Sequence, residues 1–251
     1  MKTVNLIFKT PDRYEIKEAF KALRTNVLFT GSDIKTIAIT SSAQNEGKTF
    51  ISMELAKSLS DSGKKVLLID ADLRKSVLVE RHTSENDIIG LSHYLSGQAK
   101  IDEVVYGTQF PNFNLIFSGP YPPNPVELLG SDRFSEMINH YRDVFDYIIV
   151  DTPPLGLVID AAVIAAQCDG VILNVGANHT THRTLQRIKS QLIRSNCRLI
   201  GAVLNMAEHT SYNYYKSYLL GYRSYYNKPY GNYSQSDDYA QNQYAKLNNK
   251  Q

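Results

Sequence analysis

Residues 36–49 read Thr-Ile-Ala-Ile-Thr-Ser-Ser-Ala-Gln-Asn-Glu-Gly-Lys-Thr, which is a short apolar run, a turn and a Gly-Lys-Thr triplet. The apolar run is rich in β-branched residues and predicts a buried strand, and the amphipathic residues 49–62 predict a helix. A turn between a strand and a helix is the context of a phosphate-binding loop, because main-chain N–H groups at the helix N-terminus surround a phosphate. Residues 36–62 therefore predict a nucleotide site in an α/β protein.

The rest of the chain supports this fold, because short aliphatic runs alternate with amphipathic segments from residue 36 to residue 204. This alternation is typical of βαβ units. We predict a P-loop α/β fold in which helices cover both faces of a mostly parallel sheet, preceded by a helix over residues 14–29. Four prolines predict a stiff, ordered loop over residues 119–129, with no helix until after Pro125. The predicted strands are residues 36–40, 66–69, 115–117, 147–150, 171–175 and 199–204.

Composition changes abruptly after Asn205, where aliphatic residues nearly vanish. With little to bury, this segment is predicted to form a mobile tail. The predicted organisation is an N-terminal segment over residues 1–30, a P-loop domain over 31–206 and a tail over 207–251. Of the 17 tyrosines, eleven lie in the tail: Tyr212, Tyr214, Tyr215, Tyr218, Tyr222, Tyr225, Tyr226, Tyr230, Tyr233, Tyr239 and Tyr244.

The net charge and the cysteine content exclude few classes of function. The net charge of +2 gives no indication of a nucleic-acid or membrane ligand. Cys168 and Cys197 lack metal-ligand spacing and suit buried thiols in a reducing compartment. The first ten residues hold too short an apolar run for a signal peptide, so we expect a cytoplasmic protein.

The loop residues have distinct predicted roles in binding a nucleotide. Lys48 would reach the β- and γ-phosphates, and the Thr49 hydroxyl would bind Mg²⁺. Ser42 stands where the standard pattern has its first glycine, and Asn45 tolerates a positive φ. Asn205, at the end of the last predicted strand, is a candidate adenine contact. The predicted nucleotide-binding residues are Ser42, Ala43, Gln44, Asn45, Glu46, Gly47, Lys48, Thr49 and Asn205.

Three aspartates follow other predicted strands. Asp70 and Asp72 come after residues 66–69, and Asp151 comes after residues 147–150. Ligands of open α/β sheets bind at the carboxyl ends of the strands, and carboxylates there can hold Mg²⁺. Single aspartates at strand ends are often turn residues or helix caps, but all three together with the loop favour a nucleotide site. The predicted metal ligands are Thr49, Asp70, Asp72 and Asp151, and the predicted catalytic residues are Lys48 and the same three aspartates.

These motifs together resemble the bacterial tyrosine kinases of capsule and exopolysaccharide systems, in the Gram-positive form whose catalytic domain is a separate chain. The resemblance covers nearly the whole chain. It is carried by residues 46–49, 68–74, 122–129 and 149–154 and by the terminal tyrosines.

The resemblance implies transfer of the ATP γ-phosphate to the chain's own tail tyrosines, between neighbouring subunits, to regulate polysaccharide synthesis. ATP and Mg²⁺ are the implied cofactors. The implied partners are a transmembrane polysaccharide co-polymerase, which recruits the kinase to the inner face of the membrane, and a cognate tyrosine phosphatase. Either Asp70 or Asp72 would accept the phenol proton. Arg74 could offset charge on the transferred group or only form an ion pair.

The predicted N-terminal helix carries Glu18, Lys21 and Arg24 on one face, because residues three apart are neighbours on a helix. This element is similar to one that joins subunits of the family into a ring. An ordinary solvated charged face would have the same pattern.

Two other interpretations stay open at this point. The first is a partition-type P-loop ATPase, which shares this sheet, but those ATPases place a signature lysine where this chain has Ala43. The second makes the tail a nucleic-acid-binding module in which tyrosines stack on bases, but the few cations there disfavour it and we expect no nucleic-acid partner.

Overall fold

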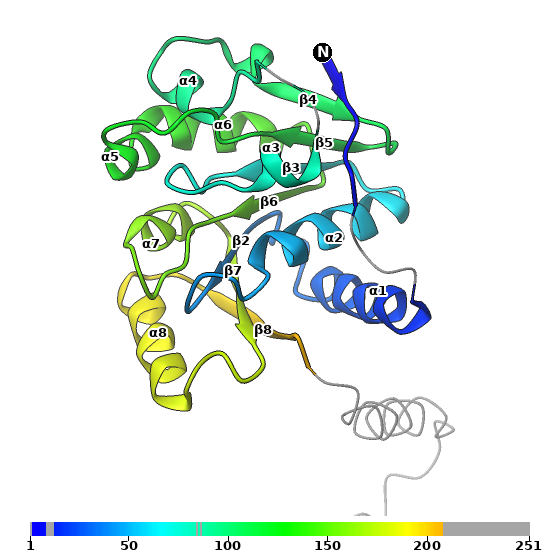
Figure 1. Ribbon diagram of the computed structural model, residues 1–251, viewed down its shortest axis with the longest axis vertical. Coiled ribbons are helices and arrows are strands. Elements are labelled where there is room, and N and C mark those ends of the chain that lie inside the picture. The colour runs from blue at the N-terminus through cyan, green and yellow to red at the C-terminus, as the bar shows by residue number, and fades with distance from the viewer. Residues whose placement is uncertain (1, 9–12, 84, 86, 208–251) are drawn as a thin grey trace, which may run out of the picture. The chain divides into compact units, whose positions relative to one another are not determined.

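The computed structural model describes residues 2–8, 13–83, 85 and 87–207 (Figure 1). The strands are β1 Lys2–Val4, β2 Thr36–Ser41, β3 Val66–Asp70, β4 Val105–Thr108, β5 Phe113–Ile116, β6 Tyr147–Asp151, β7 Gly170–Gly176 and β8 Leu199–Asn205. The helices are α1 Tyr14–Leu28, α2 Lys48–Asp61, α3 Leu78–His82, α4 Leu91–Leu95, α5 Pro125–Leu129, α6 Asp132–Arg142, α7 Asp160–Ala165 and α8 His182–Arg194, with a 3-10 turn at Ile101–Glu103.

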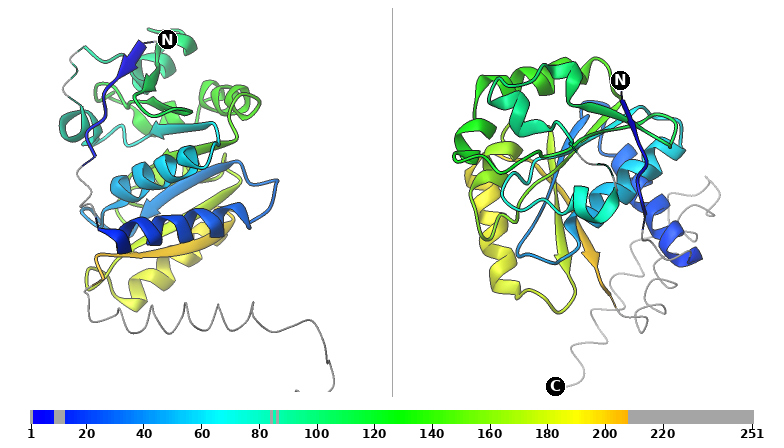
Figure 2. Two further views of the ribbon diagram at one scale, coloured as in Figure 1. Left: turned by 90° about the vertical axis from the view of Figure 1, so that its right-hand side faces the viewer. Right: turned by 45° about the horizontal axis from the view of Figure 1, so that its top comes forward.

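The residues up to Ala207 form one compact unit around a single sheet of order β1-β4-β5-β3-β6-β2-β7-β8. All neighbouring strands are parallel except β4 and β5, which are antiparallel. Figure 2 shows helices on both faces of this sheet. The predicted P-loop α/β fold is therefore confirmed.

The sheet is buried on both faces because alternate residues of each central strand enter different cores. In β2, Ile37 and Ile39 pack with α1, α2 and α3, whereas Ala38 points into the core formed with α4 to α8. The same alternation holds in β3 and β6. Burial on both faces explains why these strands are almost continuously apolar in sequence.

Strand register brings the polar strand ends together. In the centre of the sheet β3 and β2 flank β6, and Asp70 of β3 is the register partner of Asp151 of β6. The phosphate-binding turn leaves β2 at the same edge. The topology therefore places the loop and the aspartates side by side at the carboxyl edge of the sheet.

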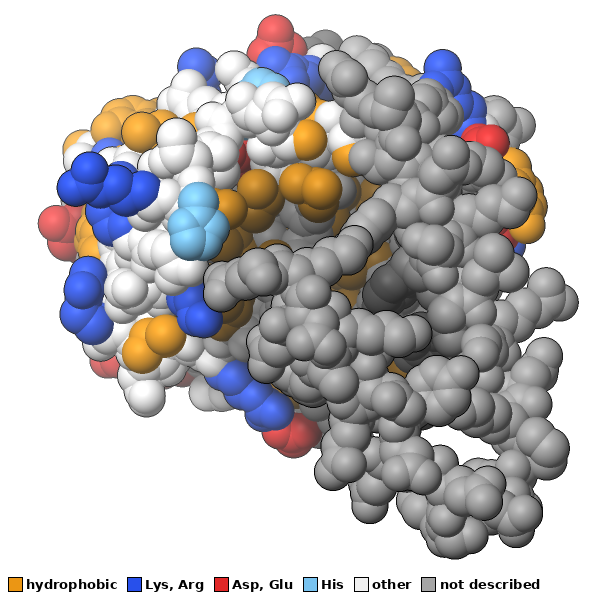
Figure 3. All heavy atoms as spheres, turned by 90° about the horizontal axis from the view of Figure 1, so that it is seen from below, with side chains coloured by type: hydrophobic (Ala, Val, Ile, Leu, Met, Phe, Trp, Pro, Cys, Tyr) orange, Lys and Arg blue, Asp and Glu red, His pale blue; other side chains and the backbone are white. Residues whose placement is uncertain are grey.

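The structure differs from the sequence predictions at the sheet's outer parts. Strands β1 and β4 were not predicted, and β5 begins two residues before the predicted strand. The expectation that helices cover both faces of the sheet fails at the last strand, because β8 is an edge strand and Leu204 is 64% exposed. Figure 3, which views the molecule from the β8 side, shows hydrophobic side chains open at the surface among basic ones.

The proline-rich segment ends in helix α5, which begins at Pro125 itself. The predicted loop therefore stops earlier than residue 129. Proline suits the first position of a helix, because the N–H that it lacks has no partner there in any helix.

The two cysteines are free thiols. Cys197 is buried and Cys168 is half-buried, and burial raises the pKa of both thiols. This agrees with the predicted structural role. In the ranges that the structure describes, no helix has the length and apolarity needed to cross a bilayer.

Candidate nucleotide site

The turn between β2 and α2 has the backbone shape of a phosphate-binding loop. Asn45 and Gly47 have φ values of 62° and 80°. A side chain at Gly47 would be strained at this φ, and its Cβ would lie 2.2 Å from the Asn205 amide nitrogen. The glycine is therefore required at this position, and the loop leads directly into the first turn of α2.

Glu46 closes the loop through its side chain. Its carboxylate accepts hydrogen bonds from the main-chain N–H groups of Ser42 at 2.9 Å and Ala43 at 3.3 Å, and from the Ser42 hydroxyl at 2.5 Å. The residue is only 1% exposed. Ser42, which replaces the expected glycine, is thus bound within the loop by Glu46.

Two asparagines from neighbouring strands hold the main chain of the same residue. The side-chain amides of Asn174 on β7 and Asn205 on β8 donate to the Glu46 carbonyl at 2.7 and 3.0 Å. Asn174 is completely buried. The Glu46 carboxylate therefore holds the loop together, and the Glu46 carbonyl anchors the loop to strands β7 and β8.

Asp151 accepts hydrogen bonds from the polar side chains at the start of α2. One carboxylate oxygen accepts from Lys48 Nζ at 3.2 Å and from the Ser52 hydroxyl at 2.9 Å. The other oxygen accepts from the Thr49 hydroxyl at 2.6 Å. Asp151 is 1% exposed, so this cluster fixes the loop lysine and threonine against the end of β6.

Asp70 and Asp72 lie next to Asp151 and Lys48, at the end of the neighbouring strand β3. Burial, and then the neighbouring Asp151, raise the pKa of Asp70 to about 7. One Asp70 oxygen accepts from the Ser76 hydroxyl and the other from the Asp72 N–H. Burial raises the pKa of Asp72, and Lys48 opposes this effect. Asp72 lines the open pocket, whereas Asp70 does not.

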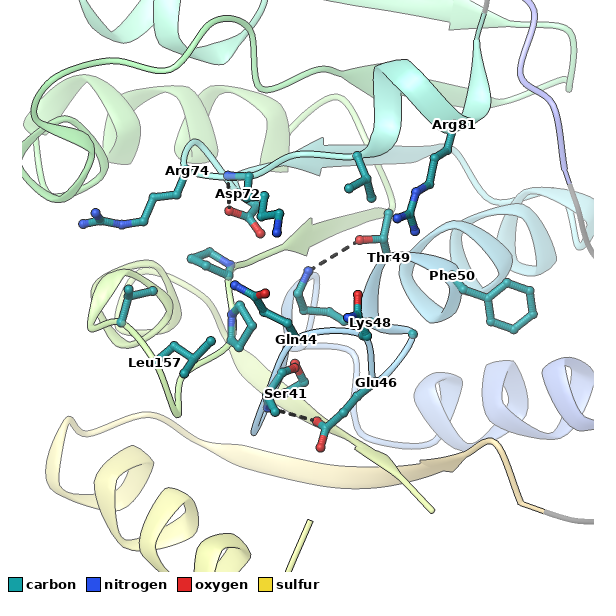
Figure 4. A pocket seen from close by; sticks show the side chains of 18 of the residues that line it. Ser41, Gln44, Glu46, Lys48, Thr49, Phe50, Asp72, Arg74, Arg81 and Leu157 are labelled. Carbon is teal, nitrogen blue, oxygen red and sulfur yellow. Dashed lines mark hydrogen bonds between the residues drawn. The ribbon is translucent and has the colours of Figure 1, made fainter. Parts of the chain in front are cut away.

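The pocket above the loop has a volume of about 250 Å³. It is lined by residues of the loop, the β3 to α3 connection, α3 and the segment after β6. Figure 4 shows Lys48 and Thr49 on the loop side of the pocket, Asp72 on the β3 side, and Arg81 pointing toward Thr49 from α3. Arg74 points outward and forms a bidentate ion pair with Asp160 at 2.7 and 3.1 Å.

The donor set fits a hard cation such as Mg²⁺, because it consists of a hydroxyl and carboxylates. Within the described ranges, no three His, Cys, Asp or Glu side chains come together as a complete metal site. Mg²⁺ binds through one or two carboxylates together with substrate phosphates and water. The residues present are thus compatible with a metal bound along with a nucleotide.

Comparisons with known proteins agree with this geometry. A family profile described as an AAA domain matches residues 34–199. The chain is 39% identical to the tyrosine-protein kinase CpsD of Streptococcus agalactiae, over 88% of this chain and 91% of that protein. It is 33% identical to the tyrosine-protein kinase YwqD of Bacillus subtilis, over 84% and 91% of the two chains.

The chain belongs to the bacterial tyrosine kinase family. A solved structure of the family, the kinase domain of the Escherichia coli tyrosine kinase ETK, superposes with a TM-score of 0.70 and 34% identity, over 75% of this chain and 74% of that one. This membership confirms the resemblance inferred from the motifs. It favours a kinase over the partition-type ATPase, and the P-loop fold implies that the chain binds a nucleotide.

The structure brings most of the predicted site residues of this family member together. Lys48, Thr49 and Asp151 are in direct contact, and Asp70 and Asp72 adjoin them. Asn205 lies beneath the loop, where its amide binds Glu46, so contact with adenine stays a prediction. The predicted tail acceptors, from Tyr212 to Tyr244, lie outside the described residues.

The predicted subunit-contact face is divided in the structure. Glu18 and Lys21 form an exposed ion pair at 2.7 Å. Arg24 instead donates to the Ser58 carbonyl of α2 at 2.9 Å. A role of these residues in a ring stays a prediction.

Sequence reasoning missed three contributors to the site: Ser52, Asn174 and Arg81. Ser52 is one helical turn after Lys48, a spacing that could have indicated contact with the same partner. Asn174 is a polar residue inside an apolar strand, which is a signal of a buried role. Arg81 follows the β3 motif by seven residues and no motif marks it.

Proposed function

We propose that this chain is an ATP- and Mg²⁺-dependent protein-tyrosine autokinase that phosphorylates its own C-terminal tyrosine cluster. The observation that carries the proposal is the contact of Lys48 and Thr49 with Asp151, beside a pocket that exposes Asp72. Tyrosine-protein kinases CpsD and YwqD, which match most of the chain, support it. The tyrosine-rich composition after Asn205 supplies the acceptors.

The residues divide into binding and proton-transfer roles. Main-chain N–H groups of residues 42–49 and the Lys48 ammonium would hold the phosphates. Thr49 and Asp151, which are hydrogen-bonded to each other, would hold Mg²⁺, and the bound metal would neutralise charge on the β- and γ-phosphates. Asp70 is assigned to the support of the Asp72 loop, because it binds the Ser76 hydroxyl and the Asp72 N–H and does not line the pocket.

Phosphoryl transfer requires that the tail phenol lies in line with the γ-phosphate and that a nearby group accepts the phenol proton. A tail phenol oxygen attacks the γ-phosphorus, the bond from that phosphorus to the β-bridging oxygen breaks, and ADP leaves. The phenol proton passes to Asp72, the carboxylate that reaches the pocket. Asp72 is suited to this role because it lines the pocket in which the γ-phosphate would lie.

The wider biological role rests on the family. We propose that the kinase regulates capsular or exopolysaccharide synthesis, that a transmembrane co-polymerase activates it and recruits it to the inner face of the cell membrane, and that a cognate phosphatase reverses its action. Phosphorylation adds about −1.5 to −2 charges per tyrosine. Several such events would make the tail strongly acidic and loosen a ring of subunits by repulsion.

The test is mass spectrometry of the purified chain after incubation with ATP and Mg²⁺, with and without the activator's cytoplasmic segment. Tail phosphotyrosine is expected in the wild type and absent from Lys48→Met. Lys57→Met changes a half-buried lysine on the same helix that does not line the pocket, and this variant should match the wild type. No tail phosphotyrosine under any of these conditions would reject the autokinase.

A mixing experiment tests transfer between subunits. Lys48→Met chains keep their tail tyrosines but cannot transfer phosphate, and chains whose tail tyrosines are all phenylalanine can transfer but not accept. Phosphotyrosine on the Lys48→Met chains is expected only after mixing. If mixing yields none although wild-type chains are phosphorylated, transfer occurs within one subunit.

A further inference from the structure

The N-terminal segment (residues 2–8) is tied to the helix beside the nucleotide pocket. The Ile7 N–H donates to the His82 carbonyl at 2.7 Å, and His82 Nδ1 lies 2.8 Å from the Ile7 carbonyl oxygen. Gln109 binds the preceding residue in the same two-point way, accepting from the Leu6 N–H at 2.8 Å and donating to its carbonyl at 2.6 Å. The segment therefore links the end of β4 to the last residue of α3.

These contacts fix α3 at both ends. Its first residue, Leu78, is completely buried in the core, and its last residue, His82, is held by Ile7. Arg81 lies between them and is exposed. Its side chain lines the pocket and points toward Thr49 (Figure 4).

Charge pairing sets Arg81 and Lys75 apart from Lys48 and Arg74 among the cations that line the pocket, and of these two Arg81 points toward Thr49. Lys48 is paired with Asp151, and Arg74 is paired with Asp160. Among the described residues, no carboxylate forms an ion pair with Arg81, although it faces a pocket built to take phosphates. A guanidinium in this position offers a planar pair of donors to a phosphate oxygen pair.

We propose that Arg81 binds the phosphate chain of the nucleotide as a second cation beside Lys48, and that the N-terminal segment holds it in place by anchoring α3. The inference rests on the proposed function only in that the pocket holds a nucleoside triphosphate. It assigns to residues 2–8 a part in nucleotide binding, although they lie at the far edge of the sheet from β8.

Calorimetric titration of the full chain with ATP in the presence of Mg²⁺ tests the first part. Arg81→Ala should weaken ATP binding about tenfold or more, as expected for a lost charge-assisted hydrogen bond, and Arg81→Lys should fall between. Arg198→Ala removes the same charge from an exposed pair with Asp33 and should match the wild type. Adenosine affinity should be equal in all four proteins.

Unchanged ATP affinity in Arg81→Ala would overturn the proposal. An equal loss of ATP and adenosine affinity would also overturn it, because the substitution would then have damaged the pocket as a whole.

A double-mutant cycle tests the anchoring. Gln109→Ala removes both hydrogen bonds to Leu6 and should weaken ATP binding about threefold in the wild type but not in Arg81→Ala. An equal effect in both backgrounds, or no effect in either, would show that the N-terminal segment does not act through Arg81.

The outcome is separable from that of the kinase proposal, because these titrations measure binding and not transfer. Weakened ATP binding by Arg81→Ala in a chain that phosphorylates no tyrosine would reject only the kinase. Tail phosphorylation with normal ATP binding by Arg81→Ala would reject only the role of Arg81.

Discussion

At the scale of single residues, the shape of the phosphate loop depends on the contacts of a few particular positions. Glu46 is held by its carboxylate and its carbonyl at once, and Asn205 donates to that carbonyl. Gly47 lies against the same asparagine amide. The shape of the loop therefore depends on a few buried contacts in addition to the glycine's backbone freedom.

A comparison of Gly47 with Gly63 separates the effect of backbone strain from the effect of steric crowding around an added Cβ. Both have positive φ, 80° and 87°, but only Gly63 has open space where a Cβ would be placed. Gly63→Ala should lower the free energy of unfolding by about 1 kcal/mol and leave ATP affinity unchanged. Gly47→Ala should in addition reduce ATP affinity at least tenfold, because Asn205 must move away from Glu46. Calorimetric titration with ATP and urea unfolding measure both effects, and equal ATP affinity in the two variants would contradict the prediction.

At the scale of elements, the sequence predicted the strands from the centre of the sheet to its β8 end and missed β1 and β4 at the other end. Strands β2, β3 and β6 are buried on both faces, so their apolar runs and the polar residues that follow them were clear signals. Strand β1 has three residues and β4 contains Gly107, so neither shows a recognisable pattern. Their pairing depends on contacts distant in sequence. Asp151 follows one of these clearly marked strands and was predicted as a site residue, whereas its partner Ser52, inside helix α2, was not.

The Asp169 carboxylate connects three parts of the fold, and its contacts predict how stability depends on pH. Asp169 accepts from the N–H groups of Lys35 and Thr36 at 2.9 and 2.8 Å, where β2 begins, and from Arg142 of α6 at 2.7 Å. Partial burial raises the pKa of this carboxyl, but these three donors outweigh burial and lower it below its ordinary value of 3.8. Stability from this group is therefore present above about pH 4 and is lost as the pH falls through the lowered pKa.

Asp169→Asn should lower the free energy of unfolding at pH 7 by about 1–3 kcal/mol, because hydrogen bonds to a charged group are weakened. The difference from the wild type should narrow below pH 4, where the wild-type carboxyl also becomes neutral. Urea unfolding between pH 7 and pH 3 measures this, with the exposed Asp143→Asn as the control. A difference that does not change with pH would show that packing, and not charge, is responsible.

At the scale of the whole molecule, α2 connects the nucleotide site to the surface that we expect to join subunits. Its first turn carries Lys48 and Thr49, and its side is covered by α1 through Phe20, which packs edge to face on Phe50 with ring centroids 5.6 Å apart. Arg24 of α1 binds Ser58 further along α2. A change in how α1 contacts a neighbouring subunit would thus reach the phosphate loop through one helix.

On the predicted contact face of α1, Arg24 binds within the chain whereas Glu18 and Lys21 are exposed, and this difference predicts which residues contact a neighbouring subunit. Because Arg24 is engaged within the chain, we predict that a contact between subunits through this face depends on Glu18 and Lys21, whose side chains are 36% and 57% exposed. Glu18→Ala/Lys21→Ala should reduce the mass measured by light scattering from that of an oligomer to that of a monomer. The free energy of unfolding should change by less than about 0.5 kcal/mol, because exposed ion pairs contribute little to stability. Lys57→Ala/Asp61→Ala removes a comparable exposed pair from α2 and should keep the wild-type mass. A wild-type chain that is already monomeric, or a mass unaffected by the α1 substitutions, would contradict a ring built on this helix.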